Sequence, residues 1–259
     1  MNFFSGFIKG FGNCFKAFGI IFNKGLWPFL LYPLIIWLLT WILTLFGITL
    51  LGDYLTGLIK EFFAINDSSG VLAFLVSLLI KISLFLVSGT FSRYILLIVL
   101  SPLIALLSEK AEEALTGKQF PFSFKQLCKD ILRGVLITLR NFSIEFVIIV
   151  LCTVLSFFIT PLTLITIPFL VLVSWYFTGF TMLDYNAERY KMKADESLNF
   201  VKANQGYACG IGCVYWLFMI LPFFIGDLIG IMFGPAVAVV GATISFLSIN
   251  GKKIKQAAV

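Results

Sequence analysis

The sequence contains no histidine, and only 12% of its 259 residues are charged. Without histidine, the chain lacks the side chain that most often serves as a general base or a metal ligand. It also lacks the G-x-S-x-G, Walker A and G-x-G-x-x-G motifs of common hydrolases and nucleotide-binding enzymes. These absences argue against an enzyme, and the sequence predicts no catalytic residue, metal or cofactor.

One acidic pair could still serve a membrane hydrolase. Asp184 and Glu188 have i,i+4 spacing and adjoin Arg189. Acidic residues near the start of a helix are ordinary stabilisers of its dipole, so we interpret the pair as a solvated helix start at the membrane interface. An enzyme would require an activity that is lost when either acid is replaced.

The five cysteines, at positions 14, 128, 152, 209 and 213, are too scattered to predict a disulfide framework. Cys209 and Cys213 would share one face of a helix. Two thiols without a histidine or a second pair make a poor metal site, so we interpret them as small apolar packing residues.

Hydrophobic residues are abundant instead. They make up 60% of the chain, phenylalanine alone supplies 30 residues, and the mean hydropathy is +1.02. A soluble domain needs far more polar surface, so this composition predicts an integral membrane protein. Lys9, Lys16 and several glycines interrupt the first 24 residues, so we expect no secretory signal there.

The basic residues are distributed unevenly along the chain. Sixteen of the 19 fall in four segments, and Lys60 alone lies in the loop 53–70. Basic loops stay on the cytoplasmic side of a membrane, so the four segments are predicted to be cytoplasmic, with both termini inside and 53–70 outside. The four segments are 1–24, 108–145, 184–202 and 252–259.

The apolar runs between these segments predict an all-α fold in a single membrane domain over residues 1–259. The runs 25–52 and 71–107 are long enough for two long transmembrane helices, because a span needs about 20 residues. Two further regions, 142–183 and 203–250, are predicted as helical hairpins.

The hairpins could cross the bilayer fully or could be re-entrant, with tips that stop inside it. The uncharged run 146–183 must hold two helices and a turn in 38 residues, and the turns at 160–168 and 221–235 are apolar. A turn that reaches outer water would normally be polar, so we favour re-entrant hairpins. Irregular backbone at that depth must be buried in protein or line water.

Three polar or amphipathic segments are predicted outside the spans. In residues 1–24, phenylalanines recur at helical spacing with lysines on other faces, which indicates an interfacial helix on the membrane. Residues 123–135 show a weaker form of this pattern. The stretch 108–117 is predicted as a polar helix that stops at Gly117.

Ionisable residues inside the apolar runs are candidates for a transport pathway, because burying them is costly. They are Lys81, Arg93 and Asp227. Lys81 and Arg93 could instead extend toward the interfaces, and Asp227 could lie in outer water. Glycines at 206 and 210, and at 226, 230 and 234, have the spacing that allows helices to pack closely, although a glycine-rich turn explains the second set equally well.

Three stretches together resemble the CysZ-type sulfate permeases, a family related to the etoposide-induced membrane proteins. They are FSRYILLIVLSPLIALLSEKAEEALTG (91–117), LDYNAER (183–189) and LPFFIGDLIGIMFGPAVAVVGAT (221–243), and their order and spacing agree over about residues 5–250. The resemblance implies two long transmembrane helices, two hemi-penetrating hairpins, cytoplasmic termini and a homo-oligomer. It also implies sulfate uptake for cysteine biosynthesis without ATP hydrolysis.

The resemblance also bears on KGLWPFLLYP (24–33). Relatives carry a Gly-Leu/Ile-Arg motif there, often with a second arginine; Gly25 and Leu26 match, but Trp27 and Pro28 stand at the arginine positions. A glycine before a helix start leaves backbone N–H groups free for an anion. The stretch could simply seat the helix at the lipid boundary, or Lys24, Gly25 and Leu26 could form a weakened anion site.

We therefore expect an inner-membrane anion channel or permease, with sulfate the anion that the resemblance implies. Membrane lipids are the other expected partner, and nucleic acid is not expected. The alternative is a membrane scaffold or quality-control protein without transport activity, as eukaryotic relatives of the family suggest. Ion flux through membranes that hold only this protein separates the two.

Overall fold

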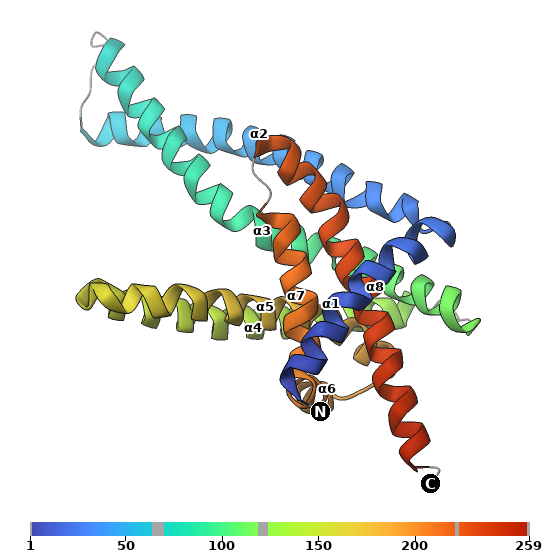
Figure 1. The fold of residues 1–259 in the computed structure, drawn as a ribbon. Helices are drawn as coiled ribbons and strands as arrows, with labels where there is room; N and C mark the ends of the chain where they lie inside the picture. Colours follow the sequence, from blue (N-terminus) through green and yellow to red (C-terminus); the bar gives the residue numbers. More distant parts are fainter. Residues whose placement is uncertain (1, 64–69, 119–123, 221–222, 258–259) are drawn as a thin grey trace. The chain divides into compact units, whose positions relative to one another are not determined.

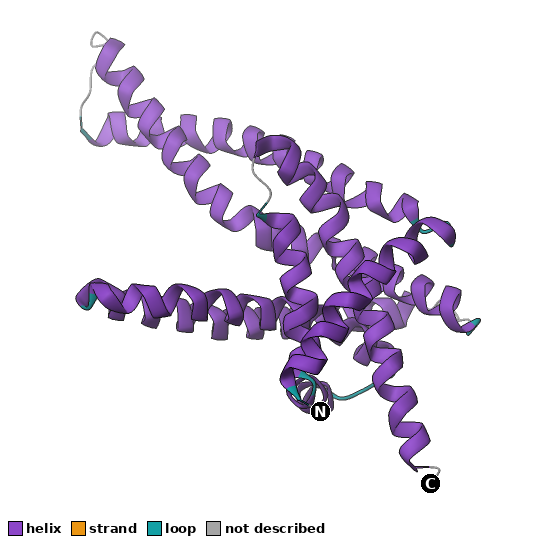
Figure 2. Cartoon of the chain, in the orientation of Figure 1, coloured by secondary structure: helices purple, strands orange, loops and turns teal. Residues whose placement is uncertain are grey.

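Every regular element among the described residues is a helix in the computed structural model (Figure 2). The structure describes the backbone of residues 2–63, 70–118, 124–220 and 223–257, and their side chains except at 86–98, 124–131, 135, 138, 223–227 and 252–257. The elements are α1 (Phe3–Asn23), η1 (Trp27–Leu30), α2 (Leu31–Phe62), α3 (Gly70–Thr116), α4 (Phe124–Phe158), η2 (Thr160–Leu162), α5 (Thr163–Arg189), α6 (Ala194–Ala203), α7 (Gln205–Met219) and α8 (Phe223–Ala257).

Four of the described segments are long and apolar enough to cross a membrane, and a shorter apolar stretch, Gly70–Phe85, opens α3. The predicted all-helical fold with candidate membrane-spanning helices is therefore confirmed for the residues that the structure describes. The four segments are Trp27–Phe62, Leu132–Phe158, Thr160–Arg189 and Leu228–Gly251.

The chain divides into two compact units. Unit 1 comprises Met1–Pro33 and Ser101–Val259, and unit 2 comprises Leu34–Leu100. This division does not test the predicted single membrane domain over residues 1–259, which stays a prediction.

Unit 2 pairs α2 with α3 through an ion pair and aromatic contacts. Lys81 Nζ lies 2.8 Å from Asp53 Oδ1. A Cβ atom at Gly52 would come within 2.9 Å of Lys81 Cγ, so the glycine lets the lysine stem lie against α2. The rings of Trp41 and Phe85 also meet, with centroids 5.9 Å apart.

Helix α8 lies at the core of unit 1, where it packs against α1, α5 and α7 (Figure 1). Most of its apolar stretch is buried, whereas few residues of the other three candidate spans are buried. Helices α4 and α5 form a long hairpin closed by η2. Within unit 1, α8 is therefore a span candidate that protein shields, packed on α1, α5 and α7.

Glycines bring the core helices of unit 1 into close contact. A Cβ atom at Gly206 or Gly210 on α7 would overlap the backbone of α1, and one at Gly212 would overlap the Trp175 carbonyl on α5. Gly230 on α8 lies equally close to α7. The predicted role of Gly206, Gly210 and Gly230 in close helix packing is therefore confirmed. The contacts of Gly226 lie outside what the structure describes.

Helix α1 has a buried face that the sequence pattern did not indicate. Its small residues are buried against α7 and α8, whereas its larger residues include several exposed phenylalanines, such as Phe4 and Phe15. The predicted amphipathic helix thus carries an apolar surface for lipid and a separate small-residue face that packs on the protein. The buried residues are Gly6, Gly10, Asn13, Cys14, Ala17 and Ile21.

The interpretation of Asp184 and Glu188 as a solvated helix start is wrong. Both lie in the last two turns of α5 and are only 4% and 6% exposed.

The predicted helix stop at Gly117 is confirmed: α3 ends at Thr116, and Gly117 has the left-handed φ of 73° that glycine adopts without strain. The predicted segments 123–135 and the first half of the hairpin at 142–183 join in one helix, α4.

Candidate functional site

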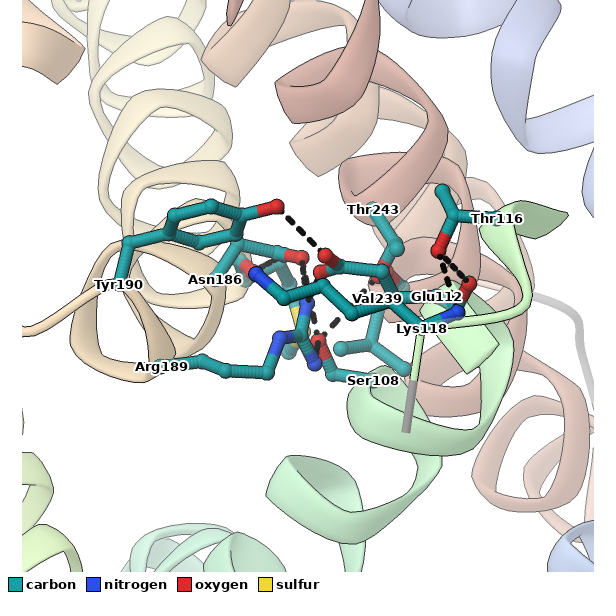
Figure 3. Close-up of polar contacts among 10 residues, drawn as sticks. Ser108, Glu112, Thr116, Lys118, Asn186, Arg189, Tyr190, Val239 and Thr243 are labelled. Atoms are coloured by element: carbon teal, nitrogen blue, oxygen red, sulfur yellow. Dashed lines mark hydrogen bonds and ion pairs between the residues drawn. The ribbon is translucent and has the colours of Figure 1, made fainter. Parts of the chain in front are cut away.

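Six polar residues from α3, α5, α8 and the turn after α5 meet in unit 1 (Figure 3); five of their side chains are buried, and Tyr190 is 38% exposed. We call them the buried cluster: Ser108 and Glu112 from α3, Asn186 and Arg189 from α5, Tyr190 just after α5, and Thr243 from α8. Unpaired charges inside a protein are costly, so the contacts among these side chains decide what the cluster can do.

The centre of the buried cluster is the ion pair between Arg189 and Glu112. Their Nη2 and Oε2 atoms are 2.6 Å apart, and the two side chains are only 8% and 0% exposed. Arg189 also donates to Asn186 Oδ1 at 2.6 Å and to Ser108 Oγ at 3.1 Å. The guanidinium is therefore held by partners from both α3 and α5.

Two hydroxyl groups extend the buried cluster. Tyr190 donates to Glu112 Oε1 at 2.5 Å, and Ser108 Oγ lies 3.2 Å from Thr243 Oγ1 on α8. Burial and the nearby Glu112 carboxylate raise the pKa of Tyr190 to about 12, so its hydroxyl stays neutral at physiological pH and acts as a donor. The cluster thereby ties α3, α5 and α8 together.

A second ion pair, partly buried, lies in the same unit. Arg133 Nη2 on α4 is 3.3 Å from Asp184 Oδ1 on α5, and Ser197 on α6 donates its hydroxyl to the same carboxylate oxygen. Asp184 therefore connects three helices, and its burial has a structural explanation that involves no reaction.

The predicted anion-site residues lie where α1 meets η1. Gly25 has a φ of 70°, and the Leu26 N–H donates to the Ile21 carbonyl at 2.9 Å, as in a glycine-terminated helix cap. Lys24 is exposed and Leu26 is buried. Gly25 thus ends α1 as well as preceding the next helix, and anion binding at these three residues stays a prediction.

Of the three pathway candidates, the structure describes the side chain of Lys81 alone. Lys81 pairs with Asp53 in unit 2. Arg93 lies in α3 and Asp227 in α8, but their side chains are outside the described residues. A pathway role for each stays a prediction.

Sequence reasoning missed the buried cluster, although a signal was present. Ser108 and Glu112 are four residues apart, as are Asn186 and Tyr190, so each pair shares one face of its helix. Polar residues repeated on one face indicate a common partner. The sequence alone predicts a polar helix over 108–117 and a solvated helix start at Asp184 and Glu188, so neither prediction pairs the two stretches.

Comparison with known proteins places the chain in a family. The family model described as Sulfate transporter CysZ/Etoposide-induced protein 2.4 matches residues 13–225. A protein named Sulfate transporter CysZ from Pseudomonas paraeruginosa is 27% identical over 238 residues, which cover 90% of this chain and 92% of that protein.

Two proteins of the same name from strains of Pseudomonas aeruginosa are 28% and 27% identical over 158 residues, which cover 60% of this chain and 61% of each relative. All three relatives are named as transporters and not as enzymes. Because the family model spans most of its length, the chain belongs to the Sulfate transporter CysZ/Etoposide-induced protein 2.4 family.

Proposed function

We propose that this protein carries sulfate across the inner membrane, as a channel or permease that does not hydrolyse ATP, to supply cysteine biosynthesis. The observation that carries the proposal is the match to a relative named Sulfate transporter CysZ over 90% of the chain. Four segments long and apolar enough to span a membrane are consistent with it. Uptake of radiolabelled sulfate by proteoliposomes that hold only this protein tests the proposal, and it also separates transport from the scaffold alternative.

We place a weak anion contact at Lys24, Gly25 and Leu26. Lys24 is exposed and supplies a positive charge beside the start of η1. The next residue after Leu26, Trp27, is 52% exposed, so its side chain is open to a solute or to the interface. Tryptophan offers one donor, whereas arginine would offer a fixed charge with paired donors.

Trp27→Arg is therefore expected to tighten sulfate binding about tenfold, because charge-assisted hydrogen bonds contribute about 1.5–3 kcal/mol. Isothermal calorimetry on the purified variants measures the change. Phe22→Arg is the matched control: Phe22 is also 52% exposed, but it belongs to α1 and precedes the junction. Equal gains from both variants would show a general charge effect and remove the proposed site.

We propose that both termini and the segments 108–140 and 184–202 face the cytoplasm, and that both hairpin tips remain inside the bilayer. The first helix of the second predicted hairpin is α7. It has 15 residues and is about 22 Å long, which is shorter than the hydrocarbon core of about 30 Å. By length, α4 and α5 could each cross. However, the uncharged end of α4, Phe146–Phe158, extends only about 20 Å, and Phe157, Phe158 and Leu164 expose apolar side chains at the tip.

Cysteine labelling tests this topology on a cysteine-free background. With a bulky impermeant reagent outside intact cells, Glu61→Cys should react fast, Thr163→Cys slowly, and Lys193→Cys only after the cells are opened. Glu61 lies in the predicted outer loop, and both Glu61 and Lys193 are exposed, so access decides their rates. Outside labelling at 193 would contradict the orientation, and fast labelling at 163 would show a crossing hairpin.

Lys81, Arg93 and Asp227 remain our candidates for the path of the anion. The side chains of Lys81 and its partner Asp53 are 35% and 67% exposed, so the ion pair is accessible. We also propose that the protein works as a homo-oligomer surrounded by lipid. The extensive exposed apolar faces of α2, α4 and α5 support that environment.

A further inference from the structure

Helix α1 runs parallel to α7 along most of its length. Near the start of both helices, a Cβ atom at Gly206 would overlap the carbonyl of Phe3. Near their ends, the rings of Phe18 and Phe218 lie 6.1 Å apart. Helix α7 carries no charged residue and is the first helix of the hairpin that we place in the bilayer. Whatever depth α7 reaches, α1 therefore reaches beside it.

The middle of α1 also lies against the middle of α8, which is a candidate span. Asn13 donates its side-chain N–H to Ser245 Oγ at 3.0 Å, and the rings of Phe18 and Phe233 lie 6.1 Å apart. Ser245 and Phe233 stand on opposite sides of the centre of the apolar stretch Leu228–Gly251. The part of α1 between these two contacts is therefore level with the centre of a candidate span.

Lys16 lies in this central part of α1, and its side chain is exposed. A charged side chain at the centre of a bilayer is costly where it meets lipid. About 20 Å of helix separates Lys16 from the start of α1 at Phe3, which the four-carbon stem of lysine does not span. No acid among the described side chains pairs with Lys16, and residues 1–24 contain none. These constraints favour water beside Lys16.

Lys16 belongs to a polar edge that follows the whole of α1. Four polar residues stand seven positions apart along it, and all four are exposed. Seven residues make nearly two helical turns, so these side chains share one side of the helix. The exposed phenylalanines Phe4 and Phe15 lie on another side. The polar edge consists of Asn2, Lys9, Lys16 and Asn23.

Each end of the polar edge meets a feature that suits an anion. At the start of α1, Asn2 lines an open pocket of about 180 Å³ together with Lys202 and Asn204. At the other end, Asn23 directly precedes Lys24, the first residue of the proposed anion contact. The two lysines of the polar edge lie between these ends. Positive charge is thus spaced along the entire helix.

We infer that the polar edge of α1 lines a water-filled path for anions inside the bilayer, with Lys16 near its midpoint. In this arrangement α1 enters the membrane beside α7, whereas the sequence pattern predicts a helix on the membrane surface. The choice of sulfate as the anion rests on the proposed function. The depth of α1 and the water beside it do not.

Depth measurement by electron spin resonance tests the insertion of α1 in the purified full-length protein in lipid nanodiscs. On a cysteine-free background, spin labels at Phe4 and Phe15, both exposed, collide with oxygen in the lipid or with a nickel complex in the water. About 16 Å of helix separates the two positions, so the Phe15 label should lie at least about 8 Å deeper. Equal depths would place α1 on the surface and overturn the inference.

Thiol labelling tests for water beside the polar edge. Lys16→Cys and Phe15→Cys place a thiol at adjacent exposed positions, one on the polar edge and one on the apolar side. With a small water-soluble methanethiosulfonate, Lys16→Cys should react about tenfold faster, because the reactive thiolate forms in water and not in lipid. Similar rates at the two positions would overturn the inference.

The charge of the reagent tests whether the water beside Lys16→Cys attracts anions. A sulfonate-bearing methanethiosulfonate should react about threefold faster than its trimethylammonium counterpart, because Lys9 and Lys24 remain. Each rate is first divided by the rate of the same reagent with a free thiol. Adding Lys9→Gln should reduce the preference, whereas adding Lys193→Gln, at an exposed position on another helix, should not. No preference for the sulfonate would contradict an anion path.

Sulfate uptake by proteoliposomes connects the polar edge with the proposed function. Lys16→Gln should lower the initial rate about fivefold, because it removes a positive charge from the path, and Lys193→Gln should leave the rate unchanged. Thermal unfolding of each variant establishes that it is folded. A wild-type protein without uptake would contradict sulfate transport, and the depth and labelling results would still decide the inference. Equal uptake by wild type and folded Lys16→Gln would overturn the path along α1.

Discussion

Glu112→Ala is expected to destabilise the protein by about 3–5 kcal/mol, because it removes one partner of a buried ion pair and leaves the other charge uncompensated. Arg189 is 8% exposed, so water cannot replace the lost carboxylate. Tyr190 would also lose its hydrogen-bond acceptor. Denaturant unfolding of the purified protein in detergent measures the difference.

A double variant and a surface variant control for this result. Replacing both partners, Glu112→Leu with Arg189→Met, should recover much of the loss, since apolar residues of similar volume can substitute for a buried pair. Glu113→Ala breaks the exposed Lys110–Glu113 pair on the same helix and should leave unfolding unchanged. If Glu112→Ala unfolds at the wild-type denaturant concentration, the buried cluster does not hold α3 to α5 and α8.

Gly212→Ala is expected to disrupt the packing of unit 1, at a cost of about 1–3 kcal/mol or more. The new methyl group would overlap the backbone carbonyl of Trp175, and backbone cannot move aside as a flexible side chain can. Helices α5 and α7 would have to separate along their contact. A lower midpoint in thermal unfolding would report this change.

Gly12→Ala is the matched control for Gly212→Ala. Gly12 also lies inside a helix, α1, but nothing lies within 4 Å of the position of its Cβ atom. Alanine there should leave stability unchanged or raise it by up to about 1 kcal/mol, because alanine favours helix. Equal destabilisation by both variants would mean that glycine matters for the backbone and not for the approach of α5 to α7.

The membrane character and the helical class follow from the sequence because they depend on average composition. Long apolar runs separated by basic segments predict spans wherever they occur, and the helix stop at Gly117 follows from a local rule about left-handed backbone. Neither prediction requires knowledge of which helix touches which. These features were therefore accessible without the structure.

The packing of α1 and the buried cluster depend on identified partners, and a single sequence does not supply them. Gly6 and Gly10 look like interruptions of an amphipathic pattern until α7 is known to lie against them. Asp184 and Glu188 look solvated because acidic residues near a helix start are ordinary stabilisers of the helix dipole. Only the positions of Arg133 and α6 show that Asp184 is buried and paired.

Sulfate uptake by proteoliposomes that contain only the purified protein tests the central claim most directly. The account predicts that radiolabelled sulfate accumulates without ATP, that excess unlabelled sulfate competes with it, and that protein-free liposomes show neither effect. Thermal unfolding of the reconstituted sample would establish that the protein is folded. A folded protein that gives no more uptake than protein-free liposomes would contradict the account and leave a membrane scaffold as the remaining function.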